Sequence, residues 1–159
     1  MELYFPGEGR LEYAWVTPRL AVGPAIVTVE NMLRLSAGGV THVLSLETDF
    51  DDSTIAGNTG ISVRWLPQPD DLRPKPLEWF SQGVGFVEEA LEADGSRVYV
   101  HCLAGIQRSP MMLLAYLCAA GMEMNKAIDL IMSARPEANF PLVYIQSVQQ
   151  FLRERKPPV

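Results

Sequence analysis

VYVHCLAGIQRSP, residues 98–110, is the stretch that decides the fold of this chain. Val98, Tyr99 and Val100 are β-branched or aromatic and follow a turn at residues 94–95, so residues 97–101 are predicted to form a strand. The seven residues 102–108 are predicted to form a loop. Residues 109–120 are apolar on all sides, which indicates a buried central helix. The stretch therefore predicts a strand, a short loop and a helix in direct succession.

This arrangement favours an anion-binding site at the loop. A short loop that opens a helix points several backbone N–H groups inward, and the helix dipole adds partial positive charge there. Arg108 supplies a planar fork that matches two phosphate oxygens. Cys102 lies at the mouth of this positive nest, and such surroundings favour the nucleophilic thiolate. The residue types thus predict a cysteine nucleophile acting on a phosphoryl group that loop amides hold.

The remaining chain alternates short strands with helices and then continues with helices alone. We expect strands at residues 13–17, 20–23, 41–46 and 62–66, and helices at 29–37, 77–94, 125–134 and 142–156. Residues 47–60 and 66–76 are expected to be loops. The acidic run 47–52 is expected to be solvated, with a position at the border of the functional site as the alternative. Gly83 and Gly85 weaken their helix, so we expect close packing there. The order predicts an α/β fold with a central mixed, mostly parallel sheet flanked by helices.

Length and composition limit the classes of protein to which this chain can belong. The chain has 159 residues, which suits a single domain spanning residues 1–159, and its net charge of −6 weighs against nucleic-acid binding. The longest apolar run, residues 110–121, is shorter than the roughly 20 residues of a membrane span. The N-terminal segment lacks the basic and apolar regions of a signal peptide. Two cysteines make no disulfide scaffold, which favours a reducing compartment. We therefore expect a cytoplasmic protein. We also expect a monomer with no membrane or nucleic-acid partner.

HCLAGIQR, residues 101–108, matches the H-C-x-x-G-x-x-R signature of the protein tyrosine phosphatases, and Ser109 matches the Ser or Thr that follows it in that family. We call residues 102–108 the signature loop. The layout from about Leu11 to Arg155 resembles the compact dual-specificity branch, as does the pair Arg135–Pro136. The resemblance implies a cysteine phosphatase fold and hydrolysis of phosphotyrosine, with phosphoserine and phosphothreonine as further substrates.

The resemblance also implies a role for each matching residue. Cys102 would attack phosphorus and form a cysteinyl-phosphate, Ser109 would stabilise Cys102 as leaving group, and His101 would orient the loop. No metal and no cofactor would be needed, and the partner would be a phosphorylated protein or a small phosphate ester. The substrate-binding residues would be those of the loop: Leu103, Ala104, Gly105, Ile106, Gln107 and Arg108.

An aspartate from an upstream loop would be the general acid, and the segment QPDDLRPKP offers Asp70 and Asp71. We choose Asp70, because it precedes Cys102 by 32 residues (102 minus 70), the spacing in dual-specificity relatives that align without a gap. The Pro-Asp start also resembles the acid loop of small prokaryotic-type members. Asp71 is expected to cap backbone amides near Arg73.

Three alternatives stay open from the sequence. The substrate could be a phosphoinositide, an RNA 5′ end or a phosphosugar, although the loop carries no cation except Arg108, which weighs against polyanions. The chain could be an inactive phosphate-binding module, or a sulfur-transfer protein like a rhodanese. Cys118 and His42 are expected to be structural. A glutamine of the last helix, Gln146, Gln149 or Gln150, could position the hydrolytic water.

Overall fold

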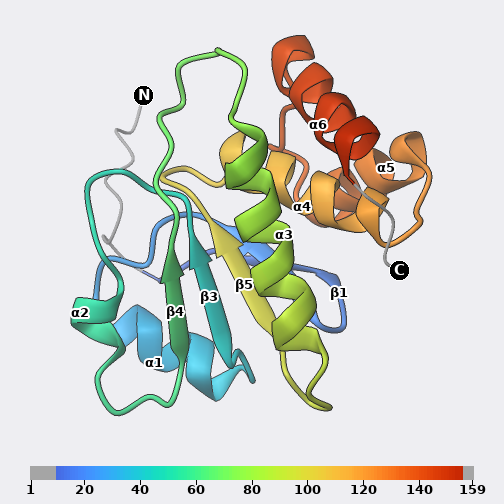
Figure 1. The fold of residues 1–159 in the computed structure, drawn as a ribbon. Helices are drawn as coiled ribbons and strands as arrows, with labels where there is room; N and C mark the ends of the chain where they lie inside the picture. The colour runs from blue at the N-terminus through green and yellow to red at the C-terminus, as the bar shows by residue number, and fades with distance from the viewer. Residues whose placement is uncertain (1–9, 156–159) are drawn as a thin grey trace.

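A five-stranded sheet forms the middle of the molecule in the computed structural model, which describes residues 10–155 (Figure 1). Its strands lie in the order β1-β2-β5-β3-β4. β2, β5, β3 and β4 are parallel, and β1 pairs with β2 in antiparallel fashion. The bounds are β1 (Ala14–Thr17), β2 (Leu20–Gly23), β3 (His42–Ser45), β4 (Ser62–Trp65) and β5 (Val98–His101). The predicted mixed, mostly parallel sheet is confirmed.

Helices cover both faces of this sheet (Figure 1). Alternate strand residues point to opposite faces, so Val98 and Val100 enter one core with α3, α4 and α6, while Tyr99 enters a second core beneath α1. No helix within residues 10–155 is long and apolar enough to cross a membrane. The bounds are α1 (Val29–Ala37), α2 (Ser53–Ala56), α3 (Leu77–Leu91), α4 (Arg108–Ala119), α5 (Met124–Ala134) and α6 (Leu142–Glu154).

The parallel strands bring three loops to one edge of the sheet. The signature loop follows the central strand β5, the segment 46–61 follows β3, and residues 66–76 follow β4. We call residues 66–76 the acid loop. In Figure 1 this loop rises above the strand ends, beside α6. Because β3 separates β4 from β5, the acid loop reaches the signature loop across the carboxyl end of a neighbouring strand.

The glycines of α3 show why one helix face can approach α4 closely. A Cβ atom on Gly83 would lie 2.4 Å from Met112 Cε, so the expected close packing is confirmed at this position. A Cβ atom on Gly85 would meet no atom within 4 Å, so the same expectation is wrong there. A side chain at Gly83 would therefore have to displace the end of the Met112 side chain, whereas one at Gly85 would not.

The segment 47–60 differs from the sequence prediction in two ways. It contains the short helix α2, and its acidic run is not solvated throughout, because Glu47 and Asp52 are only 3% and 1% exposed. Trp65 Nε1 donates to the Glu47 carbonyl oxygen, and Asp52 meets His101. Partners distant in the sequence thus bury these residues. The last helix was expected to reach Lys156; it ends at Glu154, and Lys156 lies outside the described residues, as do residues 1–9 and 157–159.

Candidate active site

Cys102 lies at the junction of β5 and the signature loop, with 2% of its surface exposed. Its Sγ atom is 3.3 Å from Ser109 Oγ, which the first turn of α4 holds at the same depth. Ser109 is fully buried. The strand and the helix thus place a thiol and a hydroxyl in direct contact, as the sequence motif required.

The backbone of the signature loop is turned so that its carbonyl groups bond outward. All six carbonyl oxygens from Cys102 to Gln107 accept a hydrogen bond. The donors, in chain order, are His101 Nδ1, Ala25 N, Arg135 Nη2, Arg135 Nε, Asn139 N and Met111 N, at 2.7–3.0 Å. Among residues 10–155, the amides from Leu103 to Arg108 find no acceptor. Those amides are left as donors for an oxyanion.

Gly105 is the residue that lets this loop pass close to its neighbour. Its φ of 71° lies in the left-handed region, and a Cβ atom there would lie 2.4 Å from the Gly23 carbonyl carbon. Any other residue would therefore clash with backbone and strain the turn. Gly105 is thus required for the loop to lie against the end of β2.

Arg108 is buried and held by one of its nitrogens. Its Nη1 atom donates to the carbonyl oxygens of Gln68, at 2.8 Å, and Leu46, at 3.3 Å. These contacts tie the signature loop to the start of the acid loop and to the end of β3. Its Nε atom is buried without a hydrogen-bond partner among the described residues. A buried unpaired donor is costly, and an oxyanion bound beside the loop amides would satisfy it.

His101 lies behind the loop and contacts a residue that the sequence analysis missed. Its Nδ1 atom is 3.0 Å from the Cys102 carbonyl oxygen, which only accepts, so Nδ1 is the donor. Its Nε2 atom contacts Asp52 Oδ2, and both side chains are at most 2% exposed. Asp52 therefore fixes the ring that bonds to the backbone of Cys102. The acidic run was expected to be a solvated loop, with a place at the border of the site as the alternative, and nothing in it marks Asp52 as the partner of His101.

Asp70 and Asp71 lie next to each other but bond to different parts of the molecule. Asp70 Oδ1 accepts from the Tyr144 hydroxyl at 2.6 Å. The hydrogen-bond network orients the Gln107 amide so that its nitrogen lies 2.8 Å from both Asp70 oxygens. Asp71 Oδ1 accepts from Arg73 N at 3.1 Å and Lys75 Nζ at 2.7 Å. The Lys75 hydrogen bond lowers the pKa of Asp71. Asp70 thus meets the signature loop, and Asp71 makes the expected capping contact.

The other residues weighed from the sequence make no hydrogen bond to Cys102 or Arg108 in the described structure. Cys118 is half-buried against the main core, and burial raises the pKa of its thiol. Burial lowers the pKa of His42, which packs edge-on against Phe86. Gln146, Gln149 and Gln150 line a cavity of about 620 Å³ between the acid loop and α6. Within residues 10–155 no three His, Cys, Asp or Glu side chains group together as metal ligands.

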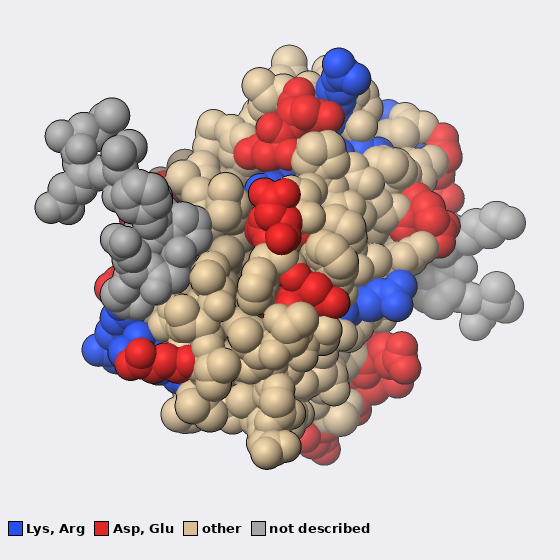
Figure 2. Space-filling model, turned by 90° about the vertical axis from the view of Figure 1, so that its left-hand side faces the viewer, with Lys and Arg blue, Asp and Glu red and all other residues tan. Residues whose placement is uncertain are grey.

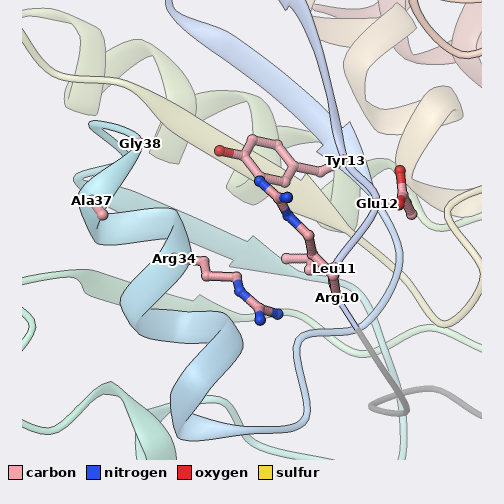
Figure 3. A pocket seen from close by; sticks show the side chains of 7 residues that line it. All are labelled: Arg10, Leu11, Glu12, Tyr13, Arg34, Ala37 and Gly38. Carbon is pink, nitrogen blue, oxygen red and sulfur yellow. The ribbon is translucent and has the colours of Figure 1, made fainter.

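A separate cavity of about 550 Å³ lies between α1 and the chain before β1 (Figure 3). Arg10 and Arg34 both line it, together with Glu12 and Tyr13. Arg34 already donates to Glu30 and to Asn31. No lining residue belongs to the signature loop or the acid loop, so the phosphate chemistry described above does not extend to this cavity.

A family model of the dual specificity phosphatase catalytic domain matches residues 27–154. The chain belongs to this family. It is a cysteine-dependent phosphatase of the compact dual-specificity branch within the protein tyrosine phosphatase superfamily. The resemblance read from HCLAGIQRS is thereby confirmed.

Known proteins similar to this phosphatase domain agree with that assignment. It is 27% identical over 156 residues to dual specificity protein phosphatase 1B of Arabidopsis thaliana, covering 91% of this chain and 84% of that protein. It is 29% identical over 124 residues to mouse dual specificity protein phosphatase 12, covering 77% of this chain but only 36% of the relative. The crystal structure of PTPMT1 in complex with PI(5)P has the same fold, with a TM-score of 0.79, 23% identity, and coverage of 89% and 95% of the two chains.

Proposed function

We propose that this phosphatase hydrolyses phosphotyrosine in proteins, and phosphoserine or phosphothreonine as well, through a cysteinyl-phosphate on Cys102. The observation that carries the proposal is the set of unpaired donors around the thiol. The amides of residues 103–108 and the Nε atom of Arg108 have no acceptor among the described residues. A phosphoryl group has three equatorial oxygens whose charge such donors stabilise during transfer.

In the first step the Cys102 thiolate forms the sulfur–phosphorus bond as the bond from phosphorus to the leaving oxygen breaks. The loop amides and Arg108 hold the equatorial oxygens, which keeps the phosphoryl group in line with the thiolate. Asp70 gives its proton to the leaving oxygen. Its contact with the Gln107 amide supports this role, because that contact places the carboxyl group against the signature loop.

In the second step water attacks phosphorus and the sulfur–phosphorus bond breaks. Asp70, now a carboxylate, takes the proton from the water. Ser109 donates a hydrogen bond to the departing thiolate, and the 3.3 Å distance between its Oγ atom and Cys102 Sγ supports this role. His101 holds the Cys102 carbonyl oxygen through both steps. Inorganic phosphate then leaves the loop.

The surroundings of the loop support an aryl phosphate rather than a polyanion. Leu103 and Ile106 are exposed within the signature loop, and Leu72 is exposed in the acid loop. No cation except Arg108 lies in the signature loop. Figure 2 shows the side that carries α2, where acidic side chains run over the middle and basic ones lie mainly at the margins. A second phosphate beside the first would meet no cation of the signature loop besides Arg108.

A phosphoinositide or another non-protein phosphate is the second candidate. PTPMT1, whose fold is similar, is seen in complex with PI(5)P. The apolar and uncharged variable positions of the loop favour the first candidate over this one. We further propose that the domain works as a cytoplasmic monomer without a nucleic-acid partner. The two free cysteines, Cys102 and Cys118, support a reducing compartment.

The test compares the wild type with Cys102→Ser on a panel of phosphopeptides, phosphoinositides and 5′-triphosphate RNA. We expect phosphotyrosine peptides to be turned over best. We expect Cys102→Ser to lose turnover while it still binds the phosphate analogue tungstate, because the alcohol stays protonated in the same nest. Residual activity above about a tenth of wild type would exclude the cysteinyl-phosphate, and a preference for the inositol lipid or the RNA would favour the second candidate.

A further inference from the structure

One buried hydroxyl on α6 bonds to the acid loop at two points. Tyr144 is 1% exposed, and its oxygen accepts from the Leu72 amide at 3.1 Å while it donates to Asp70 Oδ1 at 2.6 Å. A phenol has one proton to donate and can still accept, so both contacts form at once. The backbone of the loop and the carboxyl group of Asp70 are therefore fixed relative to the same atom.

The acid loop has a backbone conformation that needs such a contact. Leu72 has a φ of 58°, which residues other than glycine rarely adopt, although its side chain is 56% exposed. Packing of the leucine side chain therefore does not explain the conformation. Strained backbone persists only where neighbouring contacts determine it, and the contact made by the Leu72 amide is the one with Tyr144.

Further bonds hold the same loop onto α6. The Lys75 amide donates to Ser147 Oγ at 3.1 Å. The buried Lys75 ammonium bonds to the Pro69 carbonyl oxygen and to Asp71, and it lies 5.5 Å from the centre of the Tyr144 ring. Among these contacts, the one from Tyr144 reaches Asp70, whereas the one from Ser147 reaches the far end of the loop.

We propose that Tyr144 is a positioning residue that aims the Asp70 carboxyl group at the leaving oxygen of the substrate. The proposal rests on the proposed role of Asp70. Gln107 holds Asp70 from the signature loop, and Tyr144 holds it from α6, so the carboxyl group is fixed between two elements. Loss of the Tyr144 hydroxyl leaves the signature loop intact and removes one of the two contacts that fix the Asp70 carboxyl group.

The state of the hydroxyl supports this arrangement. Burial and the hydrogen bond to Asp70 raise the pKa of Tyr144 to about 12. The phenol therefore keeps its proton and remains a donor to Asp70 throughout the neutral range.

The test measures how strongly catalysis depends on the leaving group in Tyr144→Phe. With an aryl phosphate whose phenol is weakly acidic, the leaving oxygen needs a proton. We expect kcat/KM, which reports the steps up to formation of the cysteinyl-phosphate, to fall roughly 10-fold or more, from the ordinary strength of a hydrogen bond to a charged group. With a strongly acidic phenol no proton is needed, and we expect less than a twofold change. Rates are normalised to the folded fraction from near-ultraviolet circular dichroism, so partial unfolding does not imitate the effect.

Ser147→Ala is the matched control, because it removes a bond from the same helix to the same loop without touching Asp70. We expect it to change neither rate more than twofold. The double variant Asp70→Asn/Tyr144→Phe should be no slower than Asp70→Asn. An equal loss of kcat/KM on both substrates, an additional loss in the double variant, or no loss would overturn the positioning role. If Asp70→Asn itself has wild-type rates, the proposed function of Asp70 fails instead.

Discussion

Asp70 and Asp71 are adjacent in the chain, and their contacts separate them at the scale of single residues. Asp70 bonds to a side chain of the signature loop and to α6, whereas Asp71 bonds within its own loop. A general acid has to reach the leaving oxygen next to Cys102. A carboxylate tied to Arg73 and Lys75 instead stabilises the backbone of residues 66–76.

We predict that Asp70→Asn lowers kcat by about 10²–10⁴-fold on an aryl phosphate with a poor leaving group, the usual contribution of a positioned acid. The basic limb of the pH profile of kcat should disappear, because that limb reports loss of the proton from the acid. Asp71→Asn should cost less than tenfold. Steady-state measurements of kcat between pH 5 and 8 test this assignment. A larger loss of kcat in Asp71→Asn than in Asp70→Asn would make Asp71 the general acid.

Other residues of the site could not be found from the sequence. The signature residues were predictable because their chemistry depends on spacing within one short segment. Asp52 contacts His101 across 49 residues of sequence, and Tyr144 contacts Asp70 across 74. Nothing local distinguishes Asp52 from the neighbouring acids of a solvated loop, or Tyr144 from the other apolar positions of an amphipathic helix.

At the scale of elements, the pattern of apolar residues predicted most helices and strands. The outer helices bury one face, whereas β2, β5 and most of α4 are buried on all sides. Thr28 caps α1, since its side chain accepts from Asn31 N at 3.1 Å. The short helix α2 was missed, because its four residues are too few for a periodic pattern. The burial of Glu47 and Asp52 was missed for a different reason, since their partners Trp65 and His101 lie on other strands.

The contact between α3 and α4 gives a matched pair of substitutions. We predict that Gly83→Ala destabilises the protein by about 1–3 kcal/mol, the usual cost of overpacking, because the new methyl group would overlap the Met112 side chain. Gly85→Ala should be neutral or stabilise by up to about 1 kcal/mol, because its surroundings are open and alanine favours the helix. Urea unfolding of both variants measures the difference, and equal stabilities would show that Met112 moves aside without cost.

At the scale of the whole molecule, the site depends on segments from most of the chain. Ala25, before α1, and Arg135 and Asn139, after α5, bond to carbonyl oxygens of the signature loop. Asp52 follows β3, and Asp70 follows β4. The sequence predicted a parallel sheet, which places strand ends together, but it did not predict which side chains meet there. The conformation of the signature loop therefore depends on tertiary contacts that form only when the domain is folded.

The free energy of unfolding should report the buried Tyr144 hydroxyl at alkaline pH. The folded state raises the pKa of Tyr144 to about 12, from an ordinary value of 10.0. A raised pKa means that the folded state binds the proton more tightly than the unfolded state. The resulting stabilisation is fully present below pH 10 and is lost as the pH rises from about 10 to about 12.

We therefore predict that Tyr144→Phe is less stable than wild type at pH 8, because the Asp70 and Leu72 contacts are gone, and that this deficit shrinks as the pH rises to 12. Urea unfolding at several pH values measures both proteins under the same conditions, so the titration of lysines and other tyrosines cancels in the difference.

Tyr116 also has its pKa raised by burial, yet it contacts no part of the acid loop in the described structure. Tyr116→Phe should therefore change how the free energy of unfolding depends on pH above 10. It should not change how the catalytic rate depends on the leaving group, as Tyr144→Phe is expected to do. A deficit for Tyr144→Phe that stays constant from pH 8 to 12 would mean that the hydroxyl is not held in its protonated form by the fold.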